Sequence, residues 1–417
     1  MCLAVPAKLV ELRADAAVAD LHGNRVEVNT MLTPEVKVGD WVLIHAGFAI
    51  QHLDCQTVKE FLMRLESAAA KLGRDVAFME VCGTHTVNAF RCGLHSLMPP
   101  NVTLLSGPGC PVCVTAQGDV DQMIQLAARP GVTLCTYGDM LRVTGTNGSL
   151  ELSRMGGADI RVIYSAMDAV KLAADEPRRE VVLVAVGFET TAPATAIAVL
   201  EAHRRGLKNF TALVTHKLVL PAMRALLDGV PVKLDGFLCP GHVSVIIGAD
   251  VFAPIVQQYR KPCVIVGFED LQLAAGLCRL VELALAGTPR LENLYPQAVS
   301  PRGNARAQEV LDRVFEPVEA RWRGLAAIPA SGLGIRPELA EFDAARRFGL
   351  EPVDVPEPPG CRCGEVITGQ CTPHDCTLFG TACTPVRPIG PCMVSSEGTC
   401  QAWFKYKRAR KHEYVKT

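Results

Sequence analysis

The segment Gly107-Pro108-Gly109-Cys110-Pro111-Val112-Cys113 lies between a short β-rich run, Val102 to Leu105, and a helix-like run, Asp119 to Ala128. This order predicts two thiols, two residues apart, on a turn that leads from a strand into a helix. Backbone N–H groups and partial positive charge at a helix N-terminus lower a thiol pKa, and the thiolate is the form that binds metal or attacks a disulfide. By itself the motif is equally consistent with a thioredoxin-like redox pair or half of a zinc site.

An earlier run, Phe78-Met79-Glu80-Val81-Cys82-Gly83-Thr84-His85, has the same design, a strand that ends in Cys-Gly with a histidine three residues after the cysteine. If the two strands are neighbours in a parallel sheet, Cys82 and His85 meet Cys110 and Cys113 at its carboxyl edge. Open α/β folds bind their ligands at that edge.

The composition favours metal or redox chemistry in a cytoplasmic protein. The chain has 417 residues, 49% of them hydrophobic, which suits two or three domains with real cores. A formal net charge of −1 and only 6% aromatic residues argue against nucleic-acid and membrane partners. We find no apolar run of membrane-spanning length and no signal-peptide pattern. The 17 cysteines therefore indicate metal or redox sites rather than a secreted disulfide framework.

Residues 1–54 are predicted to form a small, OB-like β-barrel, because short alternating runs are separated by turn residues. Cys2 and His45 stand out in this module, although a lone histidine after a strand and a residue at a chain start both have ordinary structural explanations. From Cys55 to about Gly73, apolar residues at helical spacing predict a helix that joins the module to the rest of the chain.

Residues 55–180 and 181–300 are predicted to form two similar doubly wound α/β halves that face each other across a cleft. Neither a dinucleotide nor a P-loop motif occurs, so no nucleotide cofactor is expected. In the second half, Thr191 is a candidate N-cap, Glu189 and Thr190 are candidates for the cleft, and His242 is a candidate for either a cleft or a structural role. The strands are expected in short apolar runs at Val76–Val81, Val102–Leu105, Val132–Tyr137, Ile160–Tyr164, Val181–Val186, Phe210–Thr215, Gly236–Cys239 and Cys263–Val266.

Residues 301–417 are predicted to form an irregular lobe that is too poor in aliphatic residues to build a core of its own. Four of its cysteines have the spacing C-x14-C-x6-C-x16-C, which suits a [4Fe-4S] cluster held from wide loops. Zinc remains an alternative on spacing alone, and Cys363 competes for the first position. The predicted ligands are Cys361, Cys376, Cys383 and Cys400.

Together these motifs resemble two hydrogenase maturation families. Met1-Cys2-Leu-Ala-Val-Pro6, with Val42-Leu-Ile-His45-Ala-Gly-Phe48-Ala, is similar to the HypC-type chaperone. The Cys82 and Cys110 motifs, Gly187-Phe-Glu-Thr-Thr191-Ala-Pro193 and the terminal cysteine spacing look like its partner, the HypD-type protein. The chain thus resembles a natural HypC–HypD fusion, in which the usual C-terminal helix of the short HypC part merges with the first HypD helix.

The resemblance implies a scaffold on which the Fe(CN)2CO group of [NiFe]-hydrogenase is assembled. Cys2 and Cys82 would ligate the iron, with His45 and His85 close by. Cyanide would come from a HypE-type protein, and the finished group would pass to the precursor of the hydrogenase large subunit. Cys110 and Cys113, with the iron–sulfur lobe, would manage electrons, since a dithiol delivers two electrons when it forms a disulfide.

Two other classes of function stay open at this point. A thiol–disulfide oxidoreductase would use Cys110 and Cys113 with the cluster as electron source, and it gives no role to Cys2 or His45. A zinc-stabilised binding module would be colourless. Under the scaffold hypothesis the chain is an assembly chaperone with thiol and iron–sulfur redox activity rather than a turnover enzyme.

Overall fold

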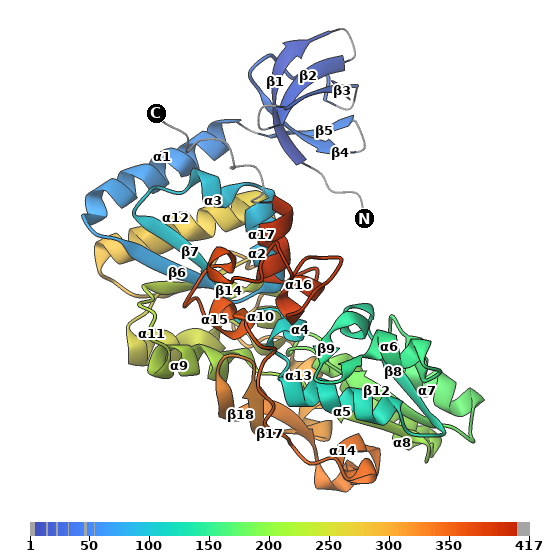
Figure 1. Ribbon diagram of the computed structural model, residues 1–417. Coiled ribbons are helices and arrows are strands. Elements are labelled where there is room, and N and C mark those ends of the chain that lie inside the picture. The colour runs from blue at the N-terminus through green and yellow to red at the C-terminus, as the bar shows by residue number, and fades with distance from the viewer. Residues whose placement is uncertain are drawn as a thin grey trace.

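The structure is a computed structural model that describes residues 5–13, 16–21, 24–31, 33–45, 48–53 and 55–406. The N-terminal strands close into a barrel in the order β1-β2-β3-β5-β4, as predicted for this module (Figure 1). Alternate residues such as Ala7 and Leu9 are buried inside it, which is the period of two expected of strands. The strands are β1 (Val5–Leu12), β2 (Ala16–Leu21), β3 (Asn24–Asn29), β4 (Trp41–His45) and β5 (Phe48–Leu53).

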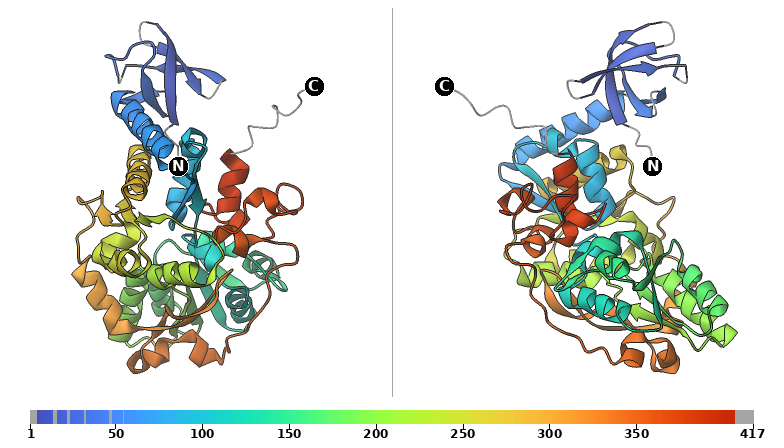
Figure 2. Two further views of the ribbon diagram at one scale, coloured as in Figure 1. Left: turned by 90° about the vertical axis from the view of Figure 1, so that its left-hand side faces the viewer. Right: turned by 45° about the vertical axis from the view of Figure 1, so that its right-hand side comes forward.

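Helix α1 (Cys55–Leu72) follows the barrel and confirms the predicted connecting helix. Leu65 and Ala69 lie one turn apart and are buried, so they form part of an apolar stripe. This stripe packs on α12 (Asp270–Ala286), and an ion pair of 2.6 Å between Arg64 and Glu282 lies at the same contact. The helix therefore belongs to the α/β body (Figure 2).

Two parallel sheets form that body, and all eight predicted strands are present. One sheet has the order β16-β15-β14-β6-β7 and the other β11-β8-β12-β13. The strands of the first sheet are β6 (Val76–Glu80), β7 (Val102–Ser106), β14 (Gly236–Pro240), β15 (Cys263–Val266) and β16 (Leu291–Asn293). Those of the second are β8 (Val132–Thr136), β11 (Asp159–Val162), β12 (Glu180–Ala185) and β13 (Phe210–Val214).

The sheets do not follow the predicted division into residues 55–180 and 181–300. The chain leaves the first sheet after β7, builds the whole second sheet, and returns to the first at β14 beside β6. Short apolar runs look alike in both sheets, and strand pairing is set by hydrogen bonds between distant segments, so sequence order alone assigns the strands incorrectly.

Helices cover both sheets and enclose three cores. One core contains residues of both sheets. The others lie on the outer faces of the sheets, against α1 and α12 on the first and against α7 (Ala166–Asp175) and α8 (Ala192–Arg205) on the second. No described helix combines the length and apolar character needed to cross a bilayer. The remaining helices up to residue 260 are α2 (Gly83–Arg91), α3 (Leu94–Leu97), α4 (Pro111–Val114), α5 (Gln117–Ala127), α6 (Leu150–Met155), α7 (Ala166–Asp175), α8 (Ala192–Arg205), α9 (Val219–Gly229), α10 (Gly241–Ile247) and α11 (Ala253–Tyr259).

The region predicted as one lobe, residues 301–417, has two parts. Its first part is regular and packs on the outer face of the second sheet, where Phe315 and Phe342 join that core. Its elements are α13 (Ala305–Val314), β17 (Phe315–Trp322), β18 (Ala326–Ile335) and α14 (Ala344–Phe348). The cysteine-rich part comes next and packs beside α2 and α4, through α15 (Cys363–Ile367), α16 (Pro391–Val394) and α17 (Thr399–Tyr406) (Figures 1 and 2).

Candidate functional site

Each sheet reverses its strand order at one point, and these two points locate the candidate site. In the first sheet, β7 lies on one side of β6, while β14, β15 and β16 extend on the other. In the second, β11 lies beside β8, and β12 and β13 extend on its other side. Open α/β sheets bind ligands in the crevice at the carboxyl ends of the two strands where the order reverses.

A cavity of about 170 Å³ lies at the reversal point of the first sheet. It has room for five or six groups of the size of water, which occupies about 30 Å³. Cys82 lies two residues after the end of β6, and His242 lies two residues after the end of β14, so both come from the strand ends at the reversal point. The lining residues are Val81, Cys82, Thr84, Gly109, Pro111, Phe188, Thr190, Thr191, Val219, Pro240, His242, Val243 and Glu397.

Cys82 is the N-cap residue of α2, in an extended conformation. It is 7% exposed, and burial raises the pKa of its thiol to about 12. Its N–H donates to Glu80 Oε2 at 2.9 Å, and burial raises the pKa of that carboxyl to about 8. Cys82 is thus protonated when no metal is bound, and a soft metal ion would displace the proton, since the thiolate is the ligating form.

The Cys110 segment lies directly against Cys82, as predicted from neighbouring parallel strands. Strand β6 pairs with β7 in parallel register, and Gly83 N–H donates to Gly109 O at 3.1 Å. A Cβ on Gly109 would lie only 2.1 Å from the Cys82 nitrogen. Glycine at this position therefore permits the close approach of the two backbones.

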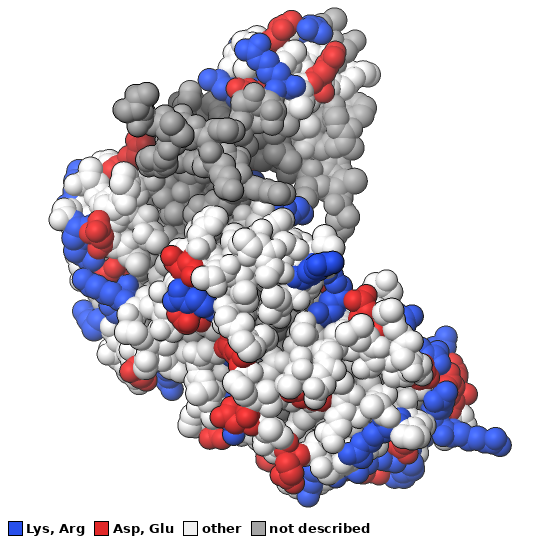
Figure 3. Space-filling model, in the orientation of Figure 1, with Lys and Arg blue, Asp and Glu red and all other residues white. Residues whose placement is uncertain are grey.

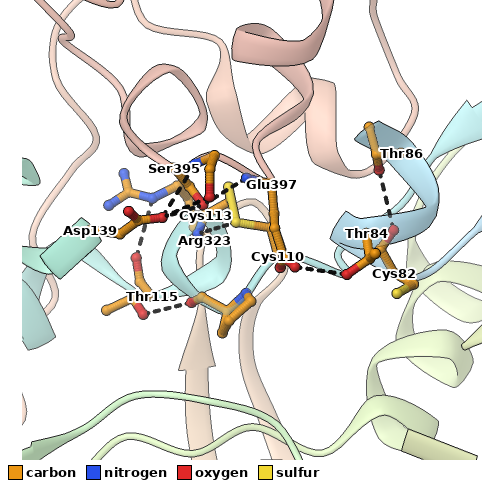
Figure 4. Close-up of a disulfide and its surroundings, with 12 residues drawn as sticks. Cys82, Thr84, Thr86, Cys110, Cys113, Thr115, Asp139, Arg323, Ser395 and Glu397 are labelled. Atoms are coloured by element: carbon orange, nitrogen blue, oxygen red, sulfur yellow. Dashed lines mark hydrogen bonds between the residues drawn. A yellow bond between two sulfur atoms is a disulfide. The ribbon is translucent and has the colours of Figure 1, made fainter. Parts of the chain in front are cut away.

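Cys110 and Cys113 are joined in a disulfide, with a Cα–Cα distance of 5.2 Å (Figure 4). Cys110 is the N-cap of α4, and its sulfur accepts from the Cys113 N–H at 3.2 Å. The predicted strand-to-helix turn is present, but the helix that Cys110 caps is the separate one-turn helix α4, and α5 begins only at Gln117. In this state the two sulfurs are bonded to each other, so neither is free to bind a metal.

His85 does not line the cavity, although sequence reasoning placed it near the iron. It is fully buried, its Nε2 lies 2.8 Å from Gly267 O, and burial lowers the pKa of its imidazole to about 4. Its ring lies 5.0 Å from that of Phe268, which stacks at 3.7 Å on His242. His85 thus supports the loop that positions His242, and His242 is the histidine that faces the cavity.

Glu397 is a cavity residue that sequence reasoning missed. It comes from the cysteine-rich part and accepts a hydrogen bond of 2.8 Å from Thr84 Oγ1, a residue 313 positions earlier (Figure 4). Burial raises the pKa of its carboxyl. No local pattern marks such a residue, because its role depends on how the cysteine-rich part folds back onto α2.

A larger cavity, of about 610 Å³, lies at the reversal point of the second sheet. It shares Pro111, Thr190, Thr191 and Glu397 with the smaller cavity, so the two adjoin. Thr190 lines the cleft as predicted, whereas Thr191 occupies the N-cap position of α8 without a side-chain capping bond. Glu189 is buried away from both cavities and accepts from Val219 N–H at 2.9 Å.

The four predicted cluster ligands line a third cavity together, along with Cys363 and Cys392. Val366, Leu378, Phe379 and Met393 make the rest of its wall largely apolar. Among the described residues, no three His, Cys, Asp or Glu side chains are positioned to hold a single metal ion. A [4Fe-4S] cluster is held by four cysteine thiolates, so the thiol-rich, apolar wall suits the donor chemistry of this group. The four predicted ligands among these lining residues are Cys361, Cys376, Cys383 and Cys400.

The cysteine-lined cavity lies close to the disulfide. Helices α15 and α16, which carry Cys363 and Cys392, both contact α4. These two cysteines and Cys113 belong to the same buried core. The three sulfur-bearing regions of the α/β body, at Cys82, at the disulfide and at the cysteine cavity, are therefore contiguous.

Two predicted site residues are not placed. Cys2 lies outside the described residues. The backbone of His45 ends β4 and pairs with Phe48, but its side chain is not described. A shared iron site between the barrel and Cys82 stays a prediction.

Comparisons with known proteins give two family matches. The family described as HypD, hydrogenase formation hypA family, matches residues 56–407, and the HupF/HypC family matches residues 1–65. The two matches overlap within α1.

Curated relatives are similar to this chain over most of its length. A hydrogenase maturation factor HypD from Azotobacter vinelandii is 47% identical over 364 residues, covering 86% of this chain and 96% of the relative. The Escherichia coli K12 factor of the same name is 42% identical over 358 residues, covering 85% of this chain and 96% of the relative. That of Rhodobacter capsulatus is 42% identical over 375 residues and is covered along its whole length.

Proposed function

The chain belongs to the HypD family of hydrogenase maturation factors, joined to a HupF/HypC domain, and from this premise we propose that it is the scaffold on which the Fe(CN)2CO group of [NiFe]-hydrogenase is assembled. The iron group is the cargo of the scaffold, and Cys82 is its ligand from the α/β body. The observation that carries the proposal is the small cavity at the first reversal point, where a buried thiol faces His242 and Glu397.

The cavity suits a low-spin iron with small ligands. A thiolate is a soft donor, which iron with strong-field ligands favours. The volume of about 170 Å³ accepts an iron and a few diatomic groups but not a large organic cofactor. Thr190 and Thr191 are hydroxyl residues of the wall, and hydroxyl donors suit the nitrogen end of cyanide.

Electrons would reach this cavity from the neighbouring sulfur groups. A [4Fe-4S] cluster on the four predicted cysteines would supply one electron at a time. Reduction of the disulfide breaks its S–S bond, takes up two electrons and yields two thiols when two protons are added. Contact of α15 and α16 with α4 supports such a relay.

A general thiol–disulfide oxidoreductase is less consistent with the geometry. Cys110 and Cys113 are 5% and 0% exposed, so a protein substrate does not reach their sulfurs without a rearrangement. The pair is better suited to exchange with groups inside the protein.

We propose a HypE-type cyanide donor and the hydrogenase large-subunit precursor as partners. The larger cavity opens next to the disulfide helix and adjoins the iron cavity, which offers a route for a partner segment. On the face shown in Figure 3, the surface over α16 and α17 has few charged side chains, and this suits contact with another protein.

The HupF/HypC domain would close the iron site with Cys2. In separate chains, such a site depends on the concentration of each component. Fusion makes the encounter intramolecular, with an effective concentration that reaches the order of millimolar when the geometry permits.

Complementation tests the proposal. The chain is expressed in a strain that lacks both its HypC-type and its HypD-type protein, and [NiFe]-hydrogenase activity is measured. We expect the wild type and Cys92→Ala to restore activity and Cys82→Ala to fail. Cys92 is a matched control because it ends α2, whose start carries Cys82, and lines neither cavity. Full activity with Cys82→Ala would refute the assignment.

A further inference from the structure

Arg323 carries a buried positive charge that the proposed function does not yet use. It is 3% exposed and lies just after β17, at the corner of the β17–β18 hairpin. Its backbone N–H donates to Val114 O at 3.0 Å. Its Nε donates to Thr115 O at 3.2 Å (Figure 4). Its Nη2 donates to Gln117 Oε1 at 3.1 Å. The side chain is therefore fixed to the segment that directly follows the disulfide.

The charge of Arg323 is only weakly balanced. The carboxylate of Glu357 lies 3.8 Å from Nη1, beyond hydrogen-bond distance, and Nη1 has no hydrogen-bond partner. The same Glu357 oxygen accepts from Gly364 N–H at 3.2 Å. The other contacts of the guanidinium are to neutral oxygens, so its hydrogen bonds hold it on the disulfide side, whereas the Glu357 carboxylate is held on the α15 side.

Arg323 lies between the two redox groups of the protein. Thr115 is two residues from Cys113, which limits their Cα separation to about 7 Å. On the other side, a Cβ on Gly324 would lie 2.7 Å from Gly364 Cα, so the hairpin corner packs onto the start of α15. A hydrogen bond with Cys392 and burial raise the pKa of the Cys363 thiol, and the charge of Arg323 opposes that shift.

Reduction of the disulfide creates the negative charge that such a cation stabilises. The S–S bond breaks and takes up two electrons. With one proton added, the products are one thiol and one thiolate. The Cys113 N–H that donates to Cys110 Sγ already favours a thiolate at Cys110.

We propose that Arg323 is a positioning charge that raises the reduction potential of the Cys110–Cys113 disulfide and so makes the pair easier to reduce. The proposal rests on the redox role assigned to this pair in the proposed function. The electron donor in the protein would be the iron–sulfur cluster, in two one-electron steps, and any dithiol reagent replaces it in vitro.

Redox titration of the full-length, anaerobically purified protein tests the proposal. The protein is equilibrated in mixtures of reduced and oxidised dithiothreitol and alkylated, and the peptide that carries both cysteines is quantified by mass spectrometry. A unit charge within about 10 Å, at an effective dielectric constant of about 20, changes such an equilibrium about tenfold. Half-reduction of the disulfide in Arg323→Gln should therefore need about a tenfold higher ratio of reduced to oxidised reagent, which corresponds to a reduction potential about 30 mV lower.

Three further variants separate charge from packing. Arg323→Lys keeps the charge and should remain near the wild-type midpoint. Glu357→Gln removes the opposing charge and should shift the midpoint toward easier reduction. Arg129→Gln is the matched control, since Arg129 also ties α5 to a backbone carbonyl, Phe348 O at 2.8 Å, at the end of the helix away from the disulfide. It should leave the midpoint unchanged.

The outcomes distinguish this proposal from the proposed function. If the wild-type pair titrates and Arg323→Gln has the same midpoint, the role of Arg323 is refuted and the redox role of the pair stands. If the midpoint of Arg323→Lys shifts as far as that of Arg323→Gln, the residue acts by packing and the proposal also fails. If Arg323→Gln does not fold, Glu357→Gln decides, and an unchanged midpoint there refutes it. A wild-type pair that never reduces overturns the redox role itself.

Discussion

Gly109→Ala tests the close approach that brings the disulfide segment to the iron cavity. The added Cβ would lie 2.1 Å from Cys82 N, 2.3 Å from Val81 C and 2.4 Å from Cys82 Cα. All three are backbone atoms, so no side chain can rotate away to make room. The segment before α4 must move by about 1 Å, and such overpacking costs about 1–3 kcal/mol.

The same movement breaks the hydrogen bond from Gly83 N–H to Gly109 O, worth about 1 kcal/mol. The expected loss in the free energy of unfolding is therefore about 2–4 kcal/mol. In urea the midpoint should fall by about 1 M. The cavity should also open, so Cys82 should react faster with N-ethylmaleimide.

Gly229→Ala is the matched control, because nothing lies within 4 Å of a Cβ at that position. It should leave the urea midpoint unchanged or raise it slightly, as glycine replacement reduces the entropy of the unfolded chain. Circular dichroism in urea and thiol labelling of the native protein measure the two effects. A Gly109→Ala protein with a wild-type midpoint and wild-type Cys82 labelling would refute the reasoning.

Three further predictions concern the sulfur groups and a buried histidine. Cys376→Ala should abolish the iron–sulfur absorbance at about 400 nm and loosen the cysteine-rich part. Cys135→Ala, in the core strand β8, should retain the absorbance. Full iron content and absorbance in Cys376→Ala would contradict the ligand assignment. Mild reduction should add two free thiols to the wild type and none to Cys113→Ser, and an equal gain in both would exclude a reversible pair. Burial lowers the pKa of His216 to about 4 in the folded protein, whereas the ordinary pKa of histidine is about 6.5. Between these two pH values the unfolded chain binds more protons than the folded protein, so stability is lost as pH falls through this window. His216→Asn should flatten the plot of the free energy of unfolding, measured by urea denaturation, against pH in this window by up to about 1.4 kcal/mol per pH unit, and an unchanged slope would contradict this.

The strands of the α/β body were predictable because their signals are local. Each is a short apolar run bounded by turn residues, and all eight appear within a few residues of the expected limits. The apolar stripe of α1 was equally clear. The adjacency of Cys82 and the Cys110 segment was also predictable from the sequence, since consecutive strands of this kind commonly pair.

The division of the body and several site residues were not predictable in this way. The second sheet is inserted between β7 and β14, and only hydrogen bonding between β6 and β14 shows this. Glu397 and Arg323 act through contacts with segments far away in the sequence. His85 lies in a more conspicuous sequence motif than His242 does. Its ring nevertheless faces Gly267, and His242 is the histidine in the cavity wall.

Infrared spectroscopy of the anaerobically purified protein tests the scaffold assignment most directly, because cyanide and carbonyl stretches fall where protein is silent. The wild type should show both kinds of band together with iron–sulfur absorbance. Cys82→Ala and Cys2→Ala should lose the bands and keep the absorbance, while Cys92→Ala should keep both. Cyanide and carbonyl bands at wild-type intensity in Cys82→Ala would show that the iron group is assembled elsewhere, and would contradict the account.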